Sequence, residues 1–288
     1  MKHRSFSLYN VISTLILLGV VIATLYPFVH MAAVSLSSSI HVLKGEVSIY
    51  PKGFQLETYK LVLKDSRIGT AYWNTIVYVV VGTAISLVIT SLGAYALAKK
   101  EMLFHKGFTL IIIFTMFFSG GMIPTFLIVK ELGVIDTIWG MVLPGAVSTW
   151  NLLIMRTFFS NIPAELEESG RMDGLTDIGV FFRIVVPLSQ AVFATIGLFY
   201  AVGLWNNFTL PLLYLRDQAL FPLQVILRNI VLSGQVNQAG AADLGDAVVM
   251  EESLKFATIM VSTVPILLIY PFLQKYFVKG VMIGAVKG

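Results

Sequence analysis

The sequence contains no cysteine, which excludes disulfide bonds, a thiolate nucleophile and any cysteine-ligated metal. No lysine precedes a serine or threonine, so the Gly-Lys-Ser/Thr core of a phosphate-binding P-loop is also missing. The four histidines form no H-E-x-x-H pair. These absences count against an intramembrane enzyme, and we expect no catalytic residue, bound cofactor or metal in this chain. The net charge of +4 is small, and we expect no nucleic-acid partner.

Charged residues are scarce, at 12% of the chain, whereas soluble domains average about 25%. Hydrophobic residues make up 57%, and the mean hydropathy is +0.83. This composition predicts an all-α integral membrane protein, with a single domain over residues 1–288. Six apolar runs each reach the roughly 20 residues that a bilayer-spanning helix needs. They cover about 9–34, 73–98, 108–129, 138–159, 185–215 and 256–277.

The distribution of Lys and Arg predicts how the chain crosses the membrane. Six spans place both termini on one side, and eleven of the 20 Lys and Arg residues fall on that side. The positive-inside rule therefore places both termini and the Lys99–Lys106 loop in the cytoplasm. The first run is too long for a signal peptide and lacks a small-x-small cleavage site, so we interpret it as an uncleaved anchor. Only the fifth run is clearly interrupted, at Trp205-Asn206-Asn207.

A dense polar segment, ELEESGRMDG, separates the fourth and fifth runs. Asn161 is expected to cap a short helix with Pro163 in its first turn, where the glutamates suit the positive end of the helix dipole. Gly174 predicts a glycine stop, and Thr176 predicts the cap of a second short helix. Gly170 is small enough for another surface to approach. The segment is either a simple interfacial link or a docking element for a soluble partner.

The same segment resembles a known family motif. Glu168-Ser169-Gly170-x-x-Asp173-Gly174, followed by Ile184-x-x-Pro187, resembles the EAA loop of ABC-importer permeases, with Ser169 and Gly170 in place of two alanines. LWNNFTLPLLYL and KYFVKGVMIGAVKG look like the MalG-like carbohydrate permeases, particularly the LplC/YtcP type for polysaccharides and oligosaccharides. The resemblance extends over nearly the whole chain.

The resemblance implies a type I ABC importer permease fold with a cytoplasmic coupling helix between spans four and five, in a loop over about 161–184. Glu168 would pair with an ATPase subunit, and Gly174 would shape the corner. The implied ATPase-coupling residues are Glu165, Glu167, Glu168, Ser169, Gly170, Arg171, Met172, Asp173 and Gly174.

The resemblance also implies the partners. They are a second permease, expected to be a homologous but different chain, two cytoplasmic ATPase subunits that use ATP and Mg, and an extracytoplasmic solute-binding protein. An oligosaccharide would be the cargo, and the bacterial cytoplasmic membrane the location, with a multi-pass chain in the lipid bilayer.

Polar residues within apolar runs are candidates for a translocation path, because facing lipid would be costly for them. Tryptophan beside asparagine suits sugars, since the ring stacks on an apolar sugar face and the amide bonds hydroxyls. The alternative is interfacial anchoring or interhelical hydrogen bonding. The candidates are Asn74, Trp150, Asn151, Tyr200, Trp205, Asn206 and Asn207. The absence of Lys and Arg at mid-span favours a neutral or mixed glycan. A permease for another solute and a secondary transporter remain open.

Overall fold

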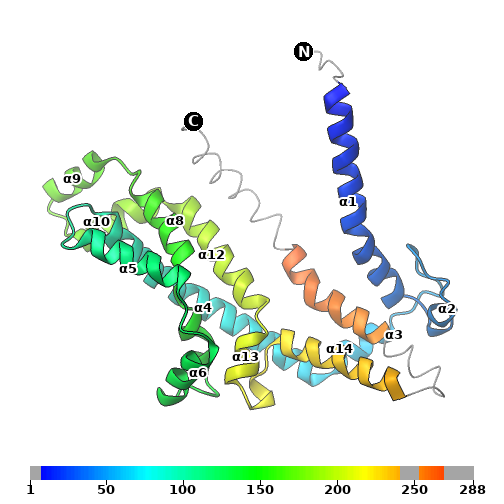
Figure 1. Cartoon of the computed structure of the whole chain (residues 1–288). Coiled ribbons are helices and arrows are strands. Elements are labelled where there is room, and N and C mark those ends of the chain that lie inside the picture. Colours follow the sequence, from blue (N-terminus) through cyan, green and yellow to red (C-terminus); the bar gives the residue numbers. More distant parts are fainter. Residues whose placement is uncertain (1–7, 241–252, 269–288) are drawn as a thin grey trace. The chain divides into compact units, whose positions relative to one another are not determined.

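The computed structural model describes residues 8–240 and 253–268 of the chain (Figure 1). Every regular element within those ranges is helical, in agreement with the prediction. The chain divides into two compact units, one from residues 1–69 with 226–264 and one from 70–225 with 265–288. All candidate site residues belong to the second unit.

In the first unit, α1 (Leu8–Ser35) is a long apolar helix, followed by the short α2 (Ser39–Leu43) and α3 (Glu57–Lys64). The buried residues of α1 begin only at Ala33, which packs with Val47. An apolar helix with so little protein around it suits a lipid environment. The described part of this unit also includes most of α14 (Leu223–Gly240) and most of the helical segment Ser253–Leu268.

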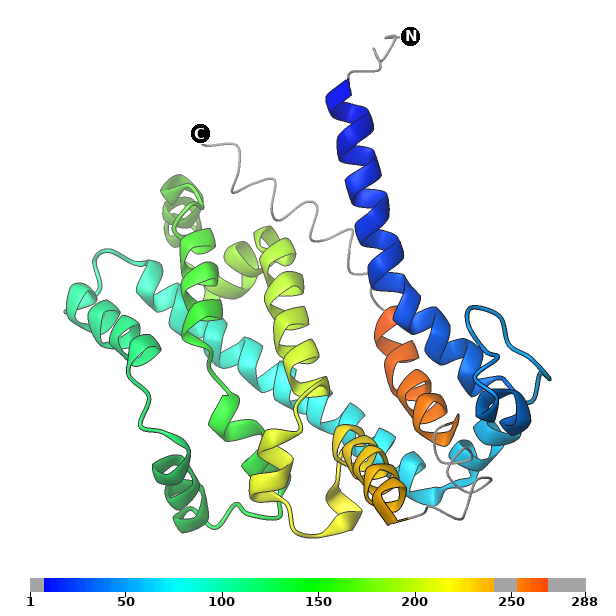
Figure 2. The same cartoon turned by 45° about the vertical axis from the view of Figure 1, so that its right-hand side comes forward.

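The second unit is built around α4 (Ser66–Ala98), with α8 (Thr149–Phe159) and α12 (Gln190–Trp205) beside it (Figures 1 and 2). At 1.5 Å per residue, α4 is about 50 Å long. Glycine allows close packing here, because a Cβ added at Gly82 would lie 2.7 Å from a methyl of Leu204 on α12. Small residues at helix crossings are typical of membrane proteins.

Three expected spans are bent pairs of helices. α5 (His105–Phe117) and α6 (Met122–Glu131) meet at 113°, next to Gly121 with φ +89°. α7 (Ile138–Val142) with 3-10 helix η1 (Leu143–Gly145) meets α8 at 58°. The segment of α10 (Asp177–Val180), π-helix η2 (Phe181–Val185) and α11 (Val186–Leu188) meets α12 at 85°.

Sequence reasoning missed most of these bends. α12 does end at Trp205, where the fifth run was expected to break, and α13 (Thr209–Tyr214) and η3 (Gln218–Leu220) follow it. The expectation that only this run is interrupted was wrong, because the third and fourth runs are bent as well. Pro187 explains the π-helix locally: it cannot donate to the carbonyl of Arg183, so the hydrogen-bond ladder widens there.

The number of membrane crossings agrees with the sequence as far as the structure describes them. In residues 8–240 and 253–268, α1 and α4 are each long and apolar enough to cross a bilayer, and counting each bent pair as one span gives up to five. The sixth run is described through Leu268, while residues 269–277 lie outside the described part of the chain.

Candidate functional site

The polar segment forms a short helix, α9 (Ala164–Met172). Its sequence of Ala, Leu, Glu and Met favours a helix. The prediction that Asn161 caps this helix was wrong: Pro163 is the N-cap, with no side-chain cap bond. The Asn161 amide instead donates to the Thr157 carbonyl at 2.8 Å and so satisfies the end of α8. Ile162 and Pro163 separate Asn161 from the start of α9, which places Asn161 too far from the helix to cap it.

The end of α9 confirms the predicted glycine stop. Gly174 has φ +80°, a backbone region that side chains rarely adopt. Its N–H donates to Arg171 O, and Leu175 N–H donates to Gly170 O, both at 3.0 Å. These two bonds are those of a Schellman motif. The predicted second cap is also confirmed, since Thr176 Oγ1 accepts from Gly179 N at 3.2 Å.

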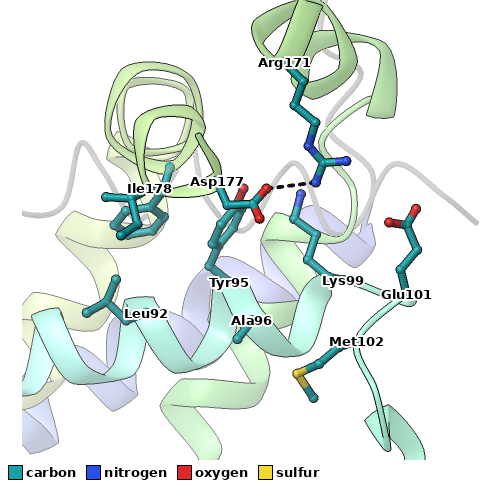
Figure 3. A pocket seen from close by; sticks show the side chains of 10 residues that line it. Leu92, Tyr95, Ala96, Lys99, Glu101, Met102, Arg171, Asp177 and Ile178 are labelled. Atoms are coloured by element: carbon teal, nitrogen blue, oxygen red, sulfur yellow. Dashed lines mark hydrogen bonds and ion pairs between the residues drawn. The ribbon is translucent and has the colours of Figure 1, made fainter. Parts of the chain in front are cut away.

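The small residue Gly170 is approached by this chain itself, and it is the buried residue of α9. A Cβ added there would lie 2.6 Å from Ile184 Cδ1 and 3.4 Å from Leu175 Cδ1. The helix therefore packs on the segment that follows it, whereas Ser169 is exposed. Arg171 Nη2 donates to Asp177 Oδ1 at 3.0 Å, which bridges the corner (Figure 3). α9 and α10 form a compact pair.

The three glutamates of α9 do not share one role. Glu165 and Glu168 are exposed, as the docking prediction requires. Glu167 is turned inward, with its side chain 14% exposed, and its carboxylate pairs with Lys99 Nζ just past the end of α4. The Lys99 side chain is 24% exposed, and its Nζ lies 4.6 Å from the centre of the Tyr95 ring.

A pocket of about 410 Å³ lies between the end of α4 and the α9–α10 pair (Figure 3). Its apolar walls come from α4, α10, η2 and Met102. Its charged lining residues are Lys99, Glu101, Arg171 and Asp177. Burial and the Arg171 guanidinium lower the pKa of Lys99, while the Asp177 and Glu101 carboxylates oppose that shift. Sequence reasoning missed the role of Lys99; the available signal was a lysine directly after a long apolar run.

Tyr200 and the backbone of Asn151 both bond Ser148 at the start of α8. Tyr200 OH accepts from Ser148 N at 2.9 Å and lies 2.7 Å from Thr90 Oγ1 of α4. Ser148 is the N-cap of α8 and accepts from Asn151 N. Asn151 is 6% exposed. Trp150, beside it in sequence, is 60% exposed.

The other path candidates lie apart from this group. Asn74 donates to Ala219 O at 2.7 Å and to Phe221 O at 3.2 Å, which ties α4 to the η3 loop. Asn206 donates to Val202 O at the end of α12, and Asn207 accepts from Leu210 N at the start of α13. These bonds fit a structural role.

Trp205 at the end of α12 contacts Tyr72 edge-on, with ring centroids 6.3 Å apart. Its indole Nε1 is buried and has no hydrogen-bond partner in the structure as described. In the described residues, no group of three or more His, Asp or Glu side chains is arranged to hold a metal ion.

Comparison with known proteins gives consistent results. Residues 102–283 match the family described as "Binding-protein-dependent transport system inner membrane component". The chain is 41% identical, over the full length of both, to the polygalacturonan/rhamnogalacturonan transport system permease protein YtcP of Bacillus subtilis (strain 168). It is 43% identical to the protein LplC of the same organism, covering 97% of this chain and 95% of LplC.

A solved structure is also similar, that of a bacterial ABC transporter involved in the import of the acidic polysaccharide alginate. The TM-score is 0.88 at 34% sequence identity, and the match covers 96% of this chain and 99% of that chain.

Proposed function

The chain belongs to the family of binding-protein-dependent transport system inner membrane components, and we propose that it imports a polysaccharide or oligosaccharide and that α9 is its docking helix for an ATPase. It has the all-helical fold of an ABC importer permease. It is a non-catalytic subunit of a transporter complex in the membrane. The whole chain, residues 1–288, acts as one permease domain.

The observation that supports the docking role is the construction of α9. The Schellman motif and the Arg171–Asp177 bond hold the corner after α9. A partner that binds α9 would therefore move α9 and α10 together as a rigid unit. The outer surface of α9 carries both charge and apolar area: Glu165 and Glu168 are exposed, and Met172 is 89% exposed. Leu166 on the same helix is 42% exposed, so α9 offers more than one apolar side chain that a protein partner can bury.

The rest of the proposed assembly is inferred from the family resemblance. The chain pairs with a second permease, which we take to be a homologous but different chain, and binds cytoplasmic ATPase subunits, two per complex, that use ATP and Mg. An extracytoplasmic protein delivers the solute. The positive-inside rule places both termini, and with them α9, in the cytoplasm of a bacterial cell.

A polysaccharide or oligosaccharide is the proposed cargo. The names of YtcP and the alginate transporter support this class, and the latter's cargo is acidic. The path would include Asn151 and Tyr200, both of which bond Ser148 at the break before α8. The scarcity of mid-span cations favours a neutral or mixed glycan, so neutral and uronic-acid oligosaccharides should be tested side by side.

The test is purification of the tagged chain, followed by reconstitution in vesicles with labelled oligosaccharides. We expect an ATPase and a second permease to copurify, and uptake to require ATP and the binding protein. Glu168→Lys should reduce the retained ATPase, whereas Lys100→Glu, an exposed charge reversal outside α9, should not. Uptake driven by a proton gradient without any ATPase would contradict the proposal.

A further inference from the structure

We propose that the Lys99–Glu167 ion pair is the link by which α9 moves α4, so that Lys99 and Glu167 are positioning residues for transport. This inference rests on the proposed docking role of α9. The EAA motif covers only the loop between the fourth and fifth spans. The structure connects Glu167 of that loop to Lys99, at the end of another span. The two adjacent glutamates therefore have different roles. Glu168 is exposed and available to a partner, whereas Glu167 faces inward and pairs with Lys99.

The ion pair is partly removed from water, so removing one of its partners costs more than it would in a surface pair. The side chains of Lys99 and Glu167 are 24% and 14% exposed, and the Tyr95 ring adds a cation–π contact to the ammonium. Exposed pairs contribute little, whereas loss of one partner from a partly buried pair leaves an unpaired charge. Reversing either charge should therefore weaken the attachment of α9 to α4.

The pocket of about 410 Å³ separates part of α9 from the end of α4. Among the described residues that line it, Arg171 is the one from α9. At the wall of the pocket, α4 contacts η2 through Tyr95 and Phe181, whose ring centroids are 5.1 Å apart. This aromatic contact holds η2, while the ion pair holds α9 itself.

α4 can pass a displacement along its length because it is bonded at its other end and in its middle. Near its start, Thr75 Oγ1 accepts from Leu223 N at 2.9 Å, and Tyr78 OH donates to Leu220 O at 2.8 Å. In its middle, Thr90 bonds Tyr200 of α12. A pull at Lys99 therefore reaches α12 and the loop at 218–223 through one continuous helix.

Charge reversal and charge exchange in the complete transporter test this link. The variants are Lys99→Glu, Glu167→Lys and the two together, with Lys100→Glu as the matched control. The measured quantity is the amount of oligosaccharide taken up per ATP hydrolysed, together with retention of the ATPase on purification. Each single reversal should lower uptake per ATP by about fivefold or more. A typical coupling free energy between two sites corresponds to a change of at least this size.

The exchanged pair should restore uptake per ATP, and Lys100→Glu should leave it unchanged. A double variant as poor as the single ones, or single variants that behave as wild type, would overturn the inference. Failure of the proposed function is distinguishable, because the wild-type complex would then show no ATP-driven uptake at all.

A second measurement covers the case in which charge reversal prevents folding. The chain has no cysteine, so Lys99→Cys with Glu167→Cys introduces the only thiols in it. A short bifunctional thiol reagent should join the two positions and recover the coupling lost in the untreated double variant. Wild-type complex treated with the same reagent is the control. Cross-linked transporter that stays uncoupled would show that α9 must move relative to α4, contrary to the inference.

Discussion

Replacing Gly174 tests whether the corner after α9 controls coupling. Gly174 has φ +80°, and no atom lies within 4 Å of where a Cβ would stand, so the cost of a side chain is conformational and not steric. Alanine in this left-handed region costs about 1 kcal/mol, and asparagine less. Proline costs about 3 kcal/mol or more, because its φ is fixed and it cannot donate to Arg171 O.

These energies set the expected order of effects. A cost of 1 kcal/mol lowers the ratio of formed to unformed corner about fivefold, and 3 kcal/mol lowers it more than about a hundredfold. If the ATPase requires the formed corner, ATPase retention and coupled uptake should fall in the order Gly, Asn, Ala, Pro at position 174. Membrane insertion, measured by yield in the membrane fraction, should stay unchanged.

Gly133 provides a matched control at the end of α6. Like Gly174, Gly133 has a positive φ, of +68°, and no atom lies within 4 Å of where a Cβ would stand. Its N–H donates to Lys130 O at 3.0 Å. Gly133→Pro therefore imposes a similar local cost away from α9 and should not release the ATPase. Normal uptake in Gly174→Pro, or equal release of the ATPase by both proline variants, would refute the reasoning.

Two further predictions concern bonds that join distant segments. Tyr200→Phe removes the hydroxyl that bonds Thr90 and accepts from Ser148 N. The variant should therefore have a free energy of unfolding in detergent that is lower by about 1–3 kcal/mol, and an unchanged value would contradict the network. The backbone N–H groups of Arg216 and Asp217 lower the pKa of Asp136. The ionised carboxylate therefore stabilises the fold at pH values above its ordinary pKa, and this stabilisation is lost as the pH falls through the lowered pKa. Asp136→Asn should abolish that acid-dependent part of the unfolding curve, and an identical pH profile in the variant would contradict the assignment.

Much of the functional assignment was accessible from local patterns. The positive-φ stop at Gly174 and the cap at Thr176 depend only on neighbouring residues, and both were predicted correctly. The cap at Asn161 was wrong because α9 begins only at Ala164, after Pro163, and the Asn161 amide instead donates to the Thr157 carbonyl at the end of α8. The bend beside Gly121 was missed because hydropathy averages over about 20 residues and so hides a turn within an apolar run.

The sequence by itself indicated a multi-span membrane protein without a P-loop, and the resemblance of its charged loop to the EAA motif implied a permease. Composition and short motifs suffice for this, because lipid restricts a spanning chain to helices. Only the tertiary structure decided which glutamate of α9 faces outward and which pairs with Lys99. That choice depends on where the end of α4 lies relative to α9, and residues 68 positions apart in the chain meet only after the helices have packed.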